Sequence, residues 1–175
     1  ATGLDLVEWQ IRVARGEPLP LAQDQVRFTG HAIEVRLCAE DETFTPHTGE
    51  VRLFLPLPLG EGRGEGTHTT NLRFDHAIQQ GTTVSPHYDS MLGKLIAHAP
   101  TRAEAIAQLA GALDRLQLLG LPTNRTFLAA CLRHDTFATG QALIPFLPEQ
   151  AEAIRTTLHH NEQAVRHEAA QAVVW

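Results

Sequence analysis

The hydrophobic residues change from the period of strands to the period of helices near Pro100, and this change constrains the fold more than any other feature. From about residue 26 to residue 96, apolar and polar residues alternate in short runs separated by turn residues, as in half-buried β-strands. After Pro100, apolar residues recur at helical spacing. Strands followed by helices predict an α+β fold, with an antiparallel β-sheet core and flanking helices.

The same patterns predict the individual elements. The candidate strands are residues 31–38, 50–55, 71–76, 82–84 and 92–98. The candidate helices are an N-terminal helix within residues 1–16, a helix from Thr101 to near Gly120, and helices at 124–133 and 149–172. Thr101 and Glu104 have the spacing of a capping box, which supports the second of these helices. The stretch 56–70 is rich in glycine and predicts a mobile surface loop.

Composition excludes several classes of function. The net charge is -6, so the sequence offers no basic surface for a nucleic acid. No apolar run approaches the roughly 20 residues that a membrane-spanning helix needs, and no N-terminal segment has the form of a secretion signal. Cys38 and Cys131 lack the spacing of a metal site and suit a reducing compartment. We therefore expect a soluble cytoplasmic protein that binds neither nucleic acid nor membrane.

The first candidate strand carries a pair of opposite charges. Its sequence is GHAIEVRLCAED, and Glu34 and Arg36 are two residues apart. Residues at this spacing lie on one face of a strand, about 6.6 Å apart. The residues at 31, 33, 35 and 37 occupy the opposite face. The charged pair has two interpretations, a solvated outer face or a functional site, and the residues alone leave both open.

A second candidate position is Asp89, which precedes the apolar run from Met91 to Ile96. An aspartate there is typical of the N-cap of a short helix, although a role in a site is the other interpretation. The sequence contains no P-loop, no HExxH motif and no nucleophile elbow. The residues alone therefore identify no complete active site.

Three motifs in order resemble a known family. GHAIEVRLCAED, then YDSMLGKLI and then GLPTN resemble the C-terminal part of biotin carboxylase, and more narrowly the biotin carboxylase segment of an acyl-CoA carboxylase α subunit. FTPHTGEV and GLDLVEWQIRVARGEPL extend the resemblance, which runs from about Gly3 to Leu147. It implies a biotin carboxylase C-terminal domain at residues 1–147 and a C-terminal helical segment at 148–175 that leads toward a linker.

The resemblance implies a function for Arg36. In that family, ATP and bicarbonate form carboxyphosphate, and biotin is then carboxylated at a ureido nitrogen. Arg36 matches the arginine that lies beside bicarbonate and biotin, which makes it a catalytic and substrate-binding residue. A guanidinium suits this position because it remains charged and stabilises negative charge that develops on the ureido oxygen. From the spacing on the strand, we further expect Glu34 to hold Arg36 in one rotamer.

Three further residues carry over from the resemblance. Ile144 matches an aliphatic contact to the adenine ring of ATP, and Arg73 matches a position at the subunit interface. Asp89 resembles an interior residue that orients the same arginine network, with a helix cap as the competing interpretation. The resemblance places no metal ligand within this chain.

The family's other catalytic segments match no part of this chain. The ATP-grasp lid and the segments that bind bicarbonate and metal are expected to precede its first residue. The implied partners are therefore that ATP-grasp region, a biotin carrier domain, a carboxyltransferase subunit that selects the acyl-CoA, and a possible second copy of the chain. Biotin, ATP and magnesium would serve the full-length enzyme, and we expect the fragment alone to bind none of them and to be inactive. The alternative is a noncatalytic assembly or binding module that reuses the fold.

Overall fold

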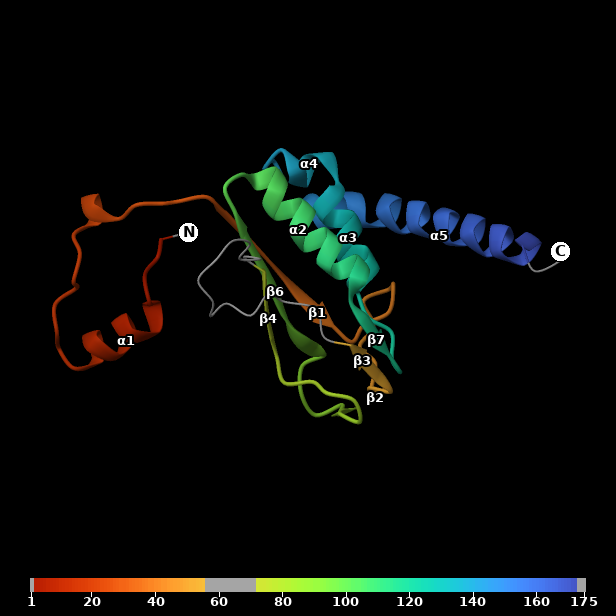
Figure 1. The fold of residues 1–175 in the computed structure, drawn as a ribbon, viewed down its shortest axis with the longest axis horizontal. Helices are drawn as coiled ribbons and strands as arrows, with labels where there is room; N and C mark the ends of the chain where they lie inside the picture. The colour runs from red at the N-terminus through yellow and green to blue at the C-terminus, as the bar shows by residue number, and fades with distance from the viewer. Residues whose placement is uncertain (1, 56–71, 173–175) are drawn as a thin grey trace, which may run out of the picture.

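The computed structural model describes residues 2–55 and 72–172, and the predicted loop at 56–70 lies outside this part of the chain. Its strands are β1 (His31–Cys38), β2 (Gly49–Glu50), β3 (Leu53–Leu55), β4 (Leu72–His76), β5 (Thr83–Val84), β6 (Met91–Ala99) and β7 (Gln117–Leu119). Its helices are α1 (Leu6–Ala14), α2 (Arg102–Arg115), α3 (Arg125–Arg133), α4 (Asp135–Ala138) and α5 (Phe146–Ala172), with a short 3-10 helix at Gln23–Gln25. The α+β prediction is confirmed (Figure 1).

The largest sheet is antiparallel and has the order β1-β6-β4. Residue Leu95 of the central strand β6 pairs with Val35 of β1 and with Phe74 of β4, and its side chain is fully buried. Helix α2 packs against β1 and β6 and buries Leu109 and Leu113 in the same core. One face of the sheet is therefore core, and charged side chains occupy the other.

Two small sheets continue the β-structure, and they differ from the prediction. The run 50–55 was predicted as one strand, but it forms β2 and β3, which pair with β5 and β7 respectively. Between them Val51 is fully buried, so the chain changes partner without leaving the core. The helix predicted to reach Gly120 ends instead at Arg115, because Leu116 adopts extended dihedral angles and leads into β7.

The helical half contains a second, smaller apolar cluster. Helix α2 begins as predicted, since Thr101 and Glu104 form the capping box. Helix α3 packs against α2, and α5 packs against α3 through a cluster that includes Phe127, Phe146 and Ile154. Because α5 starts at Phe146, it runs continuously across the predicted boundary between residues 147 and 148.

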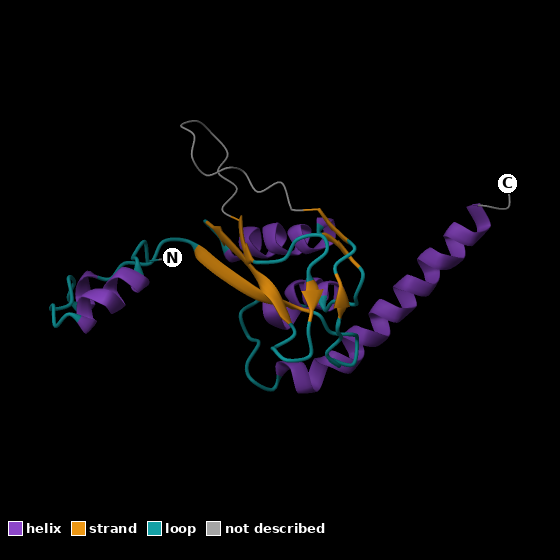
Figure 2. Cartoon of the chain, turned by 90° about the horizontal axis from the view of Figure 1, so that it is seen from below, coloured by secondary structure: helices purple, strands orange, loops and turns teal. Residues whose placement is uncertain are grey.

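Helix α1 and the C-terminal part of α5 extend away from this core. Helix α1 confirms the predicted N-terminal helix, but none of its residues is buried. It lies at one end of the molecule, and α5 projects from the other end (Figure 2). No helix among the described residues is long and apolar enough to cross a membrane.

Candidate functional site

The outer face of the three-stranded sheet gathers charges from all three strands. The strand registers define two rows that cross this face, namely Arg36, Lys94 and Asp75 in one row and Glu34, Ile96 and Arg73 in the other. We call these six residues the charged face. The prediction that Glu34 and Arg36 share one side of β1 is consistent with this register, since both are exposed while Ile33 and Leu37 are buried.

Both carboxylates of the charged face already have a cationic partner. Nζ of Lys94 lies 3.3 Å from Oε1 of Glu34, and Nε of Arg73 lies 2.9 Å from Oδ1 of Asp75. Within residues 2–55 and 72–172, no carboxylate forms an ion pair with Arg36. Glu34 thus contacts Lys94 of the neighbouring strand, which β6 brings directly opposite Arg36, and the role of Glu34 in orienting Arg36 stays a prediction.

Asp89 lies two residues before β6 and is exposed, not interior. Its Oδ1 accepts a hydrogen bond from the backbone N–H of Met91 at 3.2 Å. A strand follows it, so the interpretation as a helix cap is wrong. The hydroxyl of Ser90 donates to Oε1 of Glu40 at 2.7 Å, which joins this turn to the end of β1.

The remaining predicted residues lie in two different places. Arg73 is part of the charged face, and 71% of its side chain is exposed. Ile144 lies in the segment between α4 and α5, in the helical half of the fold, and is 97% exposed. The structure therefore brings Arg36, Glu34 and Arg73 onto one face, whereas Ile144 belongs to a separate surface.

Sequence reasoning missed Lys94, although it lay within a quoted motif. In YDSMLGKLI, Lys94 is the one charged residue after Asp89, and it interrupts an otherwise apolar strand. A lysine in the central strand of a sheet indicates that one face of that strand is polar, which is the signal that could have found it. The register with Arg36 depends on the pairing of β1 with β6, and a single sequence does not reveal that pairing.

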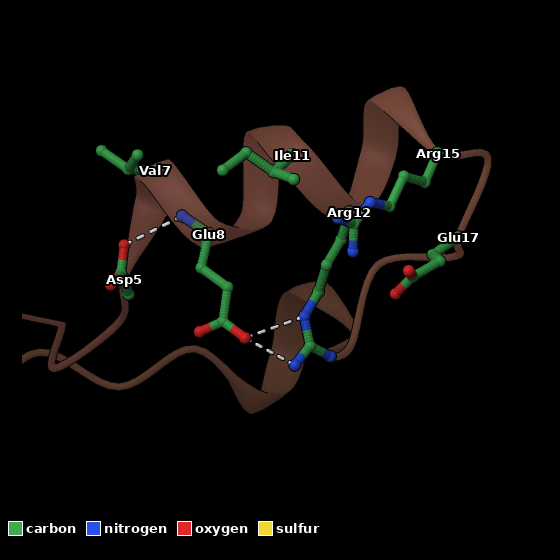
Figure 3. A pocket seen from close by; sticks show the side chains of 7 residues that line it. All are labelled: Asp5, Val7, Glu8, Ile11, Arg12, Arg15 and Glu17. Atoms are coloured by element: carbon green, nitrogen blue, oxygen red, sulfur yellow. Dashed lines mark hydrogen bonds and ion pairs between the residues drawn. The ribbon is translucent and has the colours of Figure 1, made fainter.

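A hollow in the structure lies away from the charged face. It runs along α1 and is lined by Asp5, Val7, Glu8, Ile11, Arg12, Arg15 and Glu17 (Figure 3). Its charges are largely internal to the helix, since Asp5 caps the N–H of Glu8, and Glu8 pairs with Arg12 at 2.6 Å. Among the described residues, no group of three or more histidine, cysteine or acidic side chains could hold a metal ion.

In sequence, the chain is similar to biotin carboxylases and to methylcrotonoyl-CoA carboxylase alpha subunits. Biotin carboxylase of Halalkalibacterium halodurans is 44% identical over 147 residues, which cover 83% of this chain and 30% of that protein. The mitochondrial methylcrotonoyl-CoA carboxylase subunit alpha of Arabidopsis thaliana is 41% identical over 147 residues, 83% of this chain and 19% of that protein. The chain thus spans less than a third of the length of these relatives.

Solved structures show the same fold. The biotin carboxylase subunit of pyruvate carboxylase superposes with a TM-score of 0.75 at 36% identity, over 87% of this chain and 32% of that chain. The biotin carboxylase domain dimer of the 2-oxoglutarate carboxylase of Hydrogenobacter thermophilus, solved with MgADP, ADP and bicarbonate, gives 0.74 at 32% identity, over 87% and 32% of the two chains. Residues 34–149 match the family model of the biotin carboxylase C-terminal domain, and the chain belongs to this family.

Proposed function

We propose that this chain forms one wall of the biotin and bicarbonate site of a biotin carboxylase, in which Arg36 is a catalytic residue. That enzyme carboxylates biotin with ATP and bicarbonate, as the first half-reaction of an acyl-CoA carboxylase. One observation carries the proposal. Arg36 lies on the charged face, and the two carboxylates of that face pair with Lys94 and Arg73 instead.

An arginine in this position suits an anionic substrate. Its guanidinium stays charged at any working pH and presents a planar set of donors to bicarbonate or to a developing oxyanion. A carboxylate bound to Arg36 would compete with such a ligand. Because Glu34 pairs with Lys94, its carboxylate leaves the guanidinium of Arg36 available to an anion.

The other assignments extend the proposal to further residues. Arg73 would contact a second copy of the chain, Ile144 would contact the adenine ring of ATP, and Asp89 would orient the arginine site. Biotin on a carrier domain, ATP and magnesium would be the cofactors, but the described residues contain no group of metal ligands. No step of the ATP or magnesium chemistry is therefore assigned to this chain.

The proposed partners are an ATP-grasp region of the same subunit, a biotin carrier domain and a carboxyltransferase subunit. We place the reaction in the cytoplasm, because Cys38 and Cys131 are both free thiols and suit a reducing compartment. The chain alone should neither hydrolyse ATP nor carboxylate biotin, since it aligns with only 30% of the length of a biotin carboxylase. An ATPase assay with bicarbonate and free biotin tests this, and turnover above background would contradict it.

The decisive experiment compares three variants of a full-length carboxylase subunit that carries this chain. Arg36→Ala should change the free energy of unfolding by less than about 1 kcal/mol, because the side chain is exposed. Biotin carboxylation should fall on the order of 100-fold, as for the loss of one oxyanion donor. Arg36→Lys should recover part of the rate, because a point charge lacks the planar fork.

Arg52→Ala is the matched control, since Arg52 is an exposed arginine between β2 and β3. It should leave the carboxylation rate unchanged. A wild-type rate for Arg36→Ala would reject the catalytic role and favour the noncatalytic assembly module.

A further inference from the structure

The side chain of Asn124 is bound to the backbone of β1 beside Arg36. Its Nδ2 donates to the carbonyl of Arg36 at 3.2 Å, and its Oδ1 accepts from the N–H of Cys38 at 2.9 Å. The backbone N–H of Asn124 also donates to the carbonyl of Cys38 at 3.2 Å. These three hydrogen bonds, which we call the Asn124 clamp, join the start of α3 to the end of β1.

The Asn124 clamp binds β1 at a point where its pairing with β6 is irregular. Among the described strands β1 lies at the edge of its sheet, so on one side its backbone groups pair with none of them. Its pairing with β6 is also irregular between Leu37 and Cys38, directly after Arg36. The side-chain amide of Asn124 presents an N–H donor and a carbonyl acceptor side by side, as a peptide group does, so it replaces a missing strand at this point. The clamp thereby fixes the backbone on both sides of the irregularity.

The side chain of Asn124 does not cap its own helix, α3. Asn124 occupies the N-cap position of α3, where an asparagine side chain normally accepts a hydrogen bond from the first turn of the helix. Here its side chain makes no such bond. The N-cap Thr101 of α2, by contrast, accepts from the N–H of Glu104 at 3.2 Å. The amide of Asn124 is thus used for the strand that carries Arg36 and not for its own helix.

We infer that Asn124 is a positioning residue of the biotin carboxylase site, which acts by fixing the backbone of Arg36. The inference rests on the proposed function of Arg36. A displacement of about 1 Å in a group that contacts the reacting atoms lowers rates by up to about 100-fold, so a backbone clamp on such a group controls the rate without touching the substrate. The clamp itself can be tested without any activity measurement.

Amide hydrogen exchange of this chain provides that direct test. In Asn124→Ala, the N–H of Cys38 should exchange at least about 10-fold faster, because its acceptor is gone. The N–H of Ala39 donates to the carbonyl of Ser90 at 2.8 Å and should keep its protection. Asn124→Asp should protect Cys38 partly, since a carboxylate accepts from Cys38 but donates nothing to Arg36. Unchanged exchange at Cys38 in Asn124→Ala would overturn the clamp.

The second test measures biotin carboxylation in the full-length subunit. Thr101→Ala is the matched control, because it removes a helix cap near the opposite end of the sheet, where Ala99 pairs with His31. At equal thermal stability, Asn124→Ala should lower kcat about 10-fold or more, whereas Thr101→Ala should keep it. Asn124→Ala combined with Arg36→Ala should be no slower than Arg36→Ala alone, to within about 2-fold, because both changes act through one side chain.

The outcomes separate the two proposals. An impaired Arg36→Ala together with an Asn124→Ala that matches Thr101→Ala overturns only the positioning role. Additive losses in the combined variant overturn it as well, since Asn124 would then act independently of Arg36. A wild-type rate for Arg36→Ala rejects the proposed function itself, and the exchange result still decides whether the clamp exists.

Discussion

Lys94 holds Glu34 through an ion pair of 3.3 Å, although it lies directly opposite Arg36. Both side chains of the pair are partly exposed, at 36% and 43%, so the pair contributes at most about 1 kcal/mol to stability. Its main consequence is electrostatic. While Glu34 pairs with Lys94, its carboxylate does not neutralise Arg36, which lies two residues further along β1.

On the proposed role of Arg36, replacing Lys94 in a full-length carboxylase subunit that carries this chain should weaken bicarbonate binding. In Lys94→Met, Glu34 loses its partner and can pair with Arg36, so the KM for bicarbonate should rise about 10-fold, the effect of about 1.4 kcal/mol. Glu34→Gln combined with Lys94→Met should reverse most of this rise, because the competing carboxylate is gone. Steady-state kinetics of both variants check the prediction. Equal KM values for the single and the combined variant would show that Glu34 does not compete for Arg36.

The strand that carries Arg36 was fully predictable from the sequence, and its contacts were not. The bounds of the strand at residues 31–38 could be predicted because apolar and polar residues alternate there, which indicates that one face is buried. Alternation says nothing about which strand lies beside β1, so the partner of Glu34 depended on a pairing with residues 91–99 that is distant in sequence. The role of Asn124 was hidden for the same reason, because 86 positions separate it from Cys38.

The errors at 50–55 and after Arg115 have one common cause. β3 and β7 are both very short strands that pair with each other, so neither has enough residues to show a period of its own. The expectation of a helix up to Gly120 extended a real helical pattern past its end. Tertiary pairing with β3 stabilises the extended conformation there, which local propensity did not reveal.

Gly120 should tolerate no side chain. Its φ of +121° lies in a region that favours glycine, and a Cβ there would lie 2.1 Å from the carbonyl oxygen of Glu50 and 2.8 Å from the backbone nitrogen of Arg52. Gly120→Ala should lower the free energy of unfolding by at least about 2 kcal/mol, because backbone atoms must move. Urea denaturation measures the loss.

Gly111 provides the matched control for this change. It lies within α2, and the nearest atom that a Cβ at this position would meet is Nη1 of the flexible Arg115 side chain, at 3.2 Å. Gly111→Ala should raise stability by up to about 1 kcal/mol through helix propensity. Equal effects of the two alanine substitutions would contradict the predicted backbone clash at Gly120.

The free energy of unfolding should depend on pH through the ionisation of Asp41. Its carboxylate accepts from Nε2 of His47 at 2.8 Å and from the hydroxyl of Thr43 at 2.7 Å, and these contacts hold the pKa of Asp41 well below its usual range. A lowered pKa in the folded state means that the ionised form stabilises the fold. This contribution is complete above the unfolded pKa of about 3.9 and is lost as the pH falls below it toward the lower folded pKa.

Urea denaturation as a function of pH measures this contribution. Asp41→Asn should be less stable than the wild type at pH 7, and the difference should shrink progressively below a pH of about 4. Asp24→Asn, at an exposed aspartate in the short 3-10 helix, should follow the wild-type profile throughout. A constant difference between Asp41→Asn and the wild type at all pH values would show that the ionisation of Asp41 does not contribute.

Arg155 attaches the start of α5 to the segment that follows β1. Its Nη1 donates to the carbonyl of Glu42 at 3.0 Å, and its guanidinium lies 5.1 Å from the ring centre of Phe44, which packs edge-on against Phe127 of α3. Only 23% of the side chain is exposed. Its Nη2 also pairs with Oε2 of Glu152 at 3.4 Å, while the inaccessible Nε has no hydrogen-bond partner among the described residues.

Arg155→Ala should lower the free energy of unfolding by about 1–3 kcal/mol, because it removes both the packing of the long side chain and a hydrogen bond to a backbone carbonyl. Arg155→Met should lose less, since it keeps most of the packing of the long side chain. Arg166→Ala is the control on the same helix. Arg166 is 77% exposed and pairs with Glu162 four residues earlier, so its loss should stay within about 0.5 kcal/mol. Urea denaturation of the three variants gives the ranking, and an Arg155→Met variant no more stable than Arg155→Ala would show that the packing of the long side chain does not stabilise the attachment of α5.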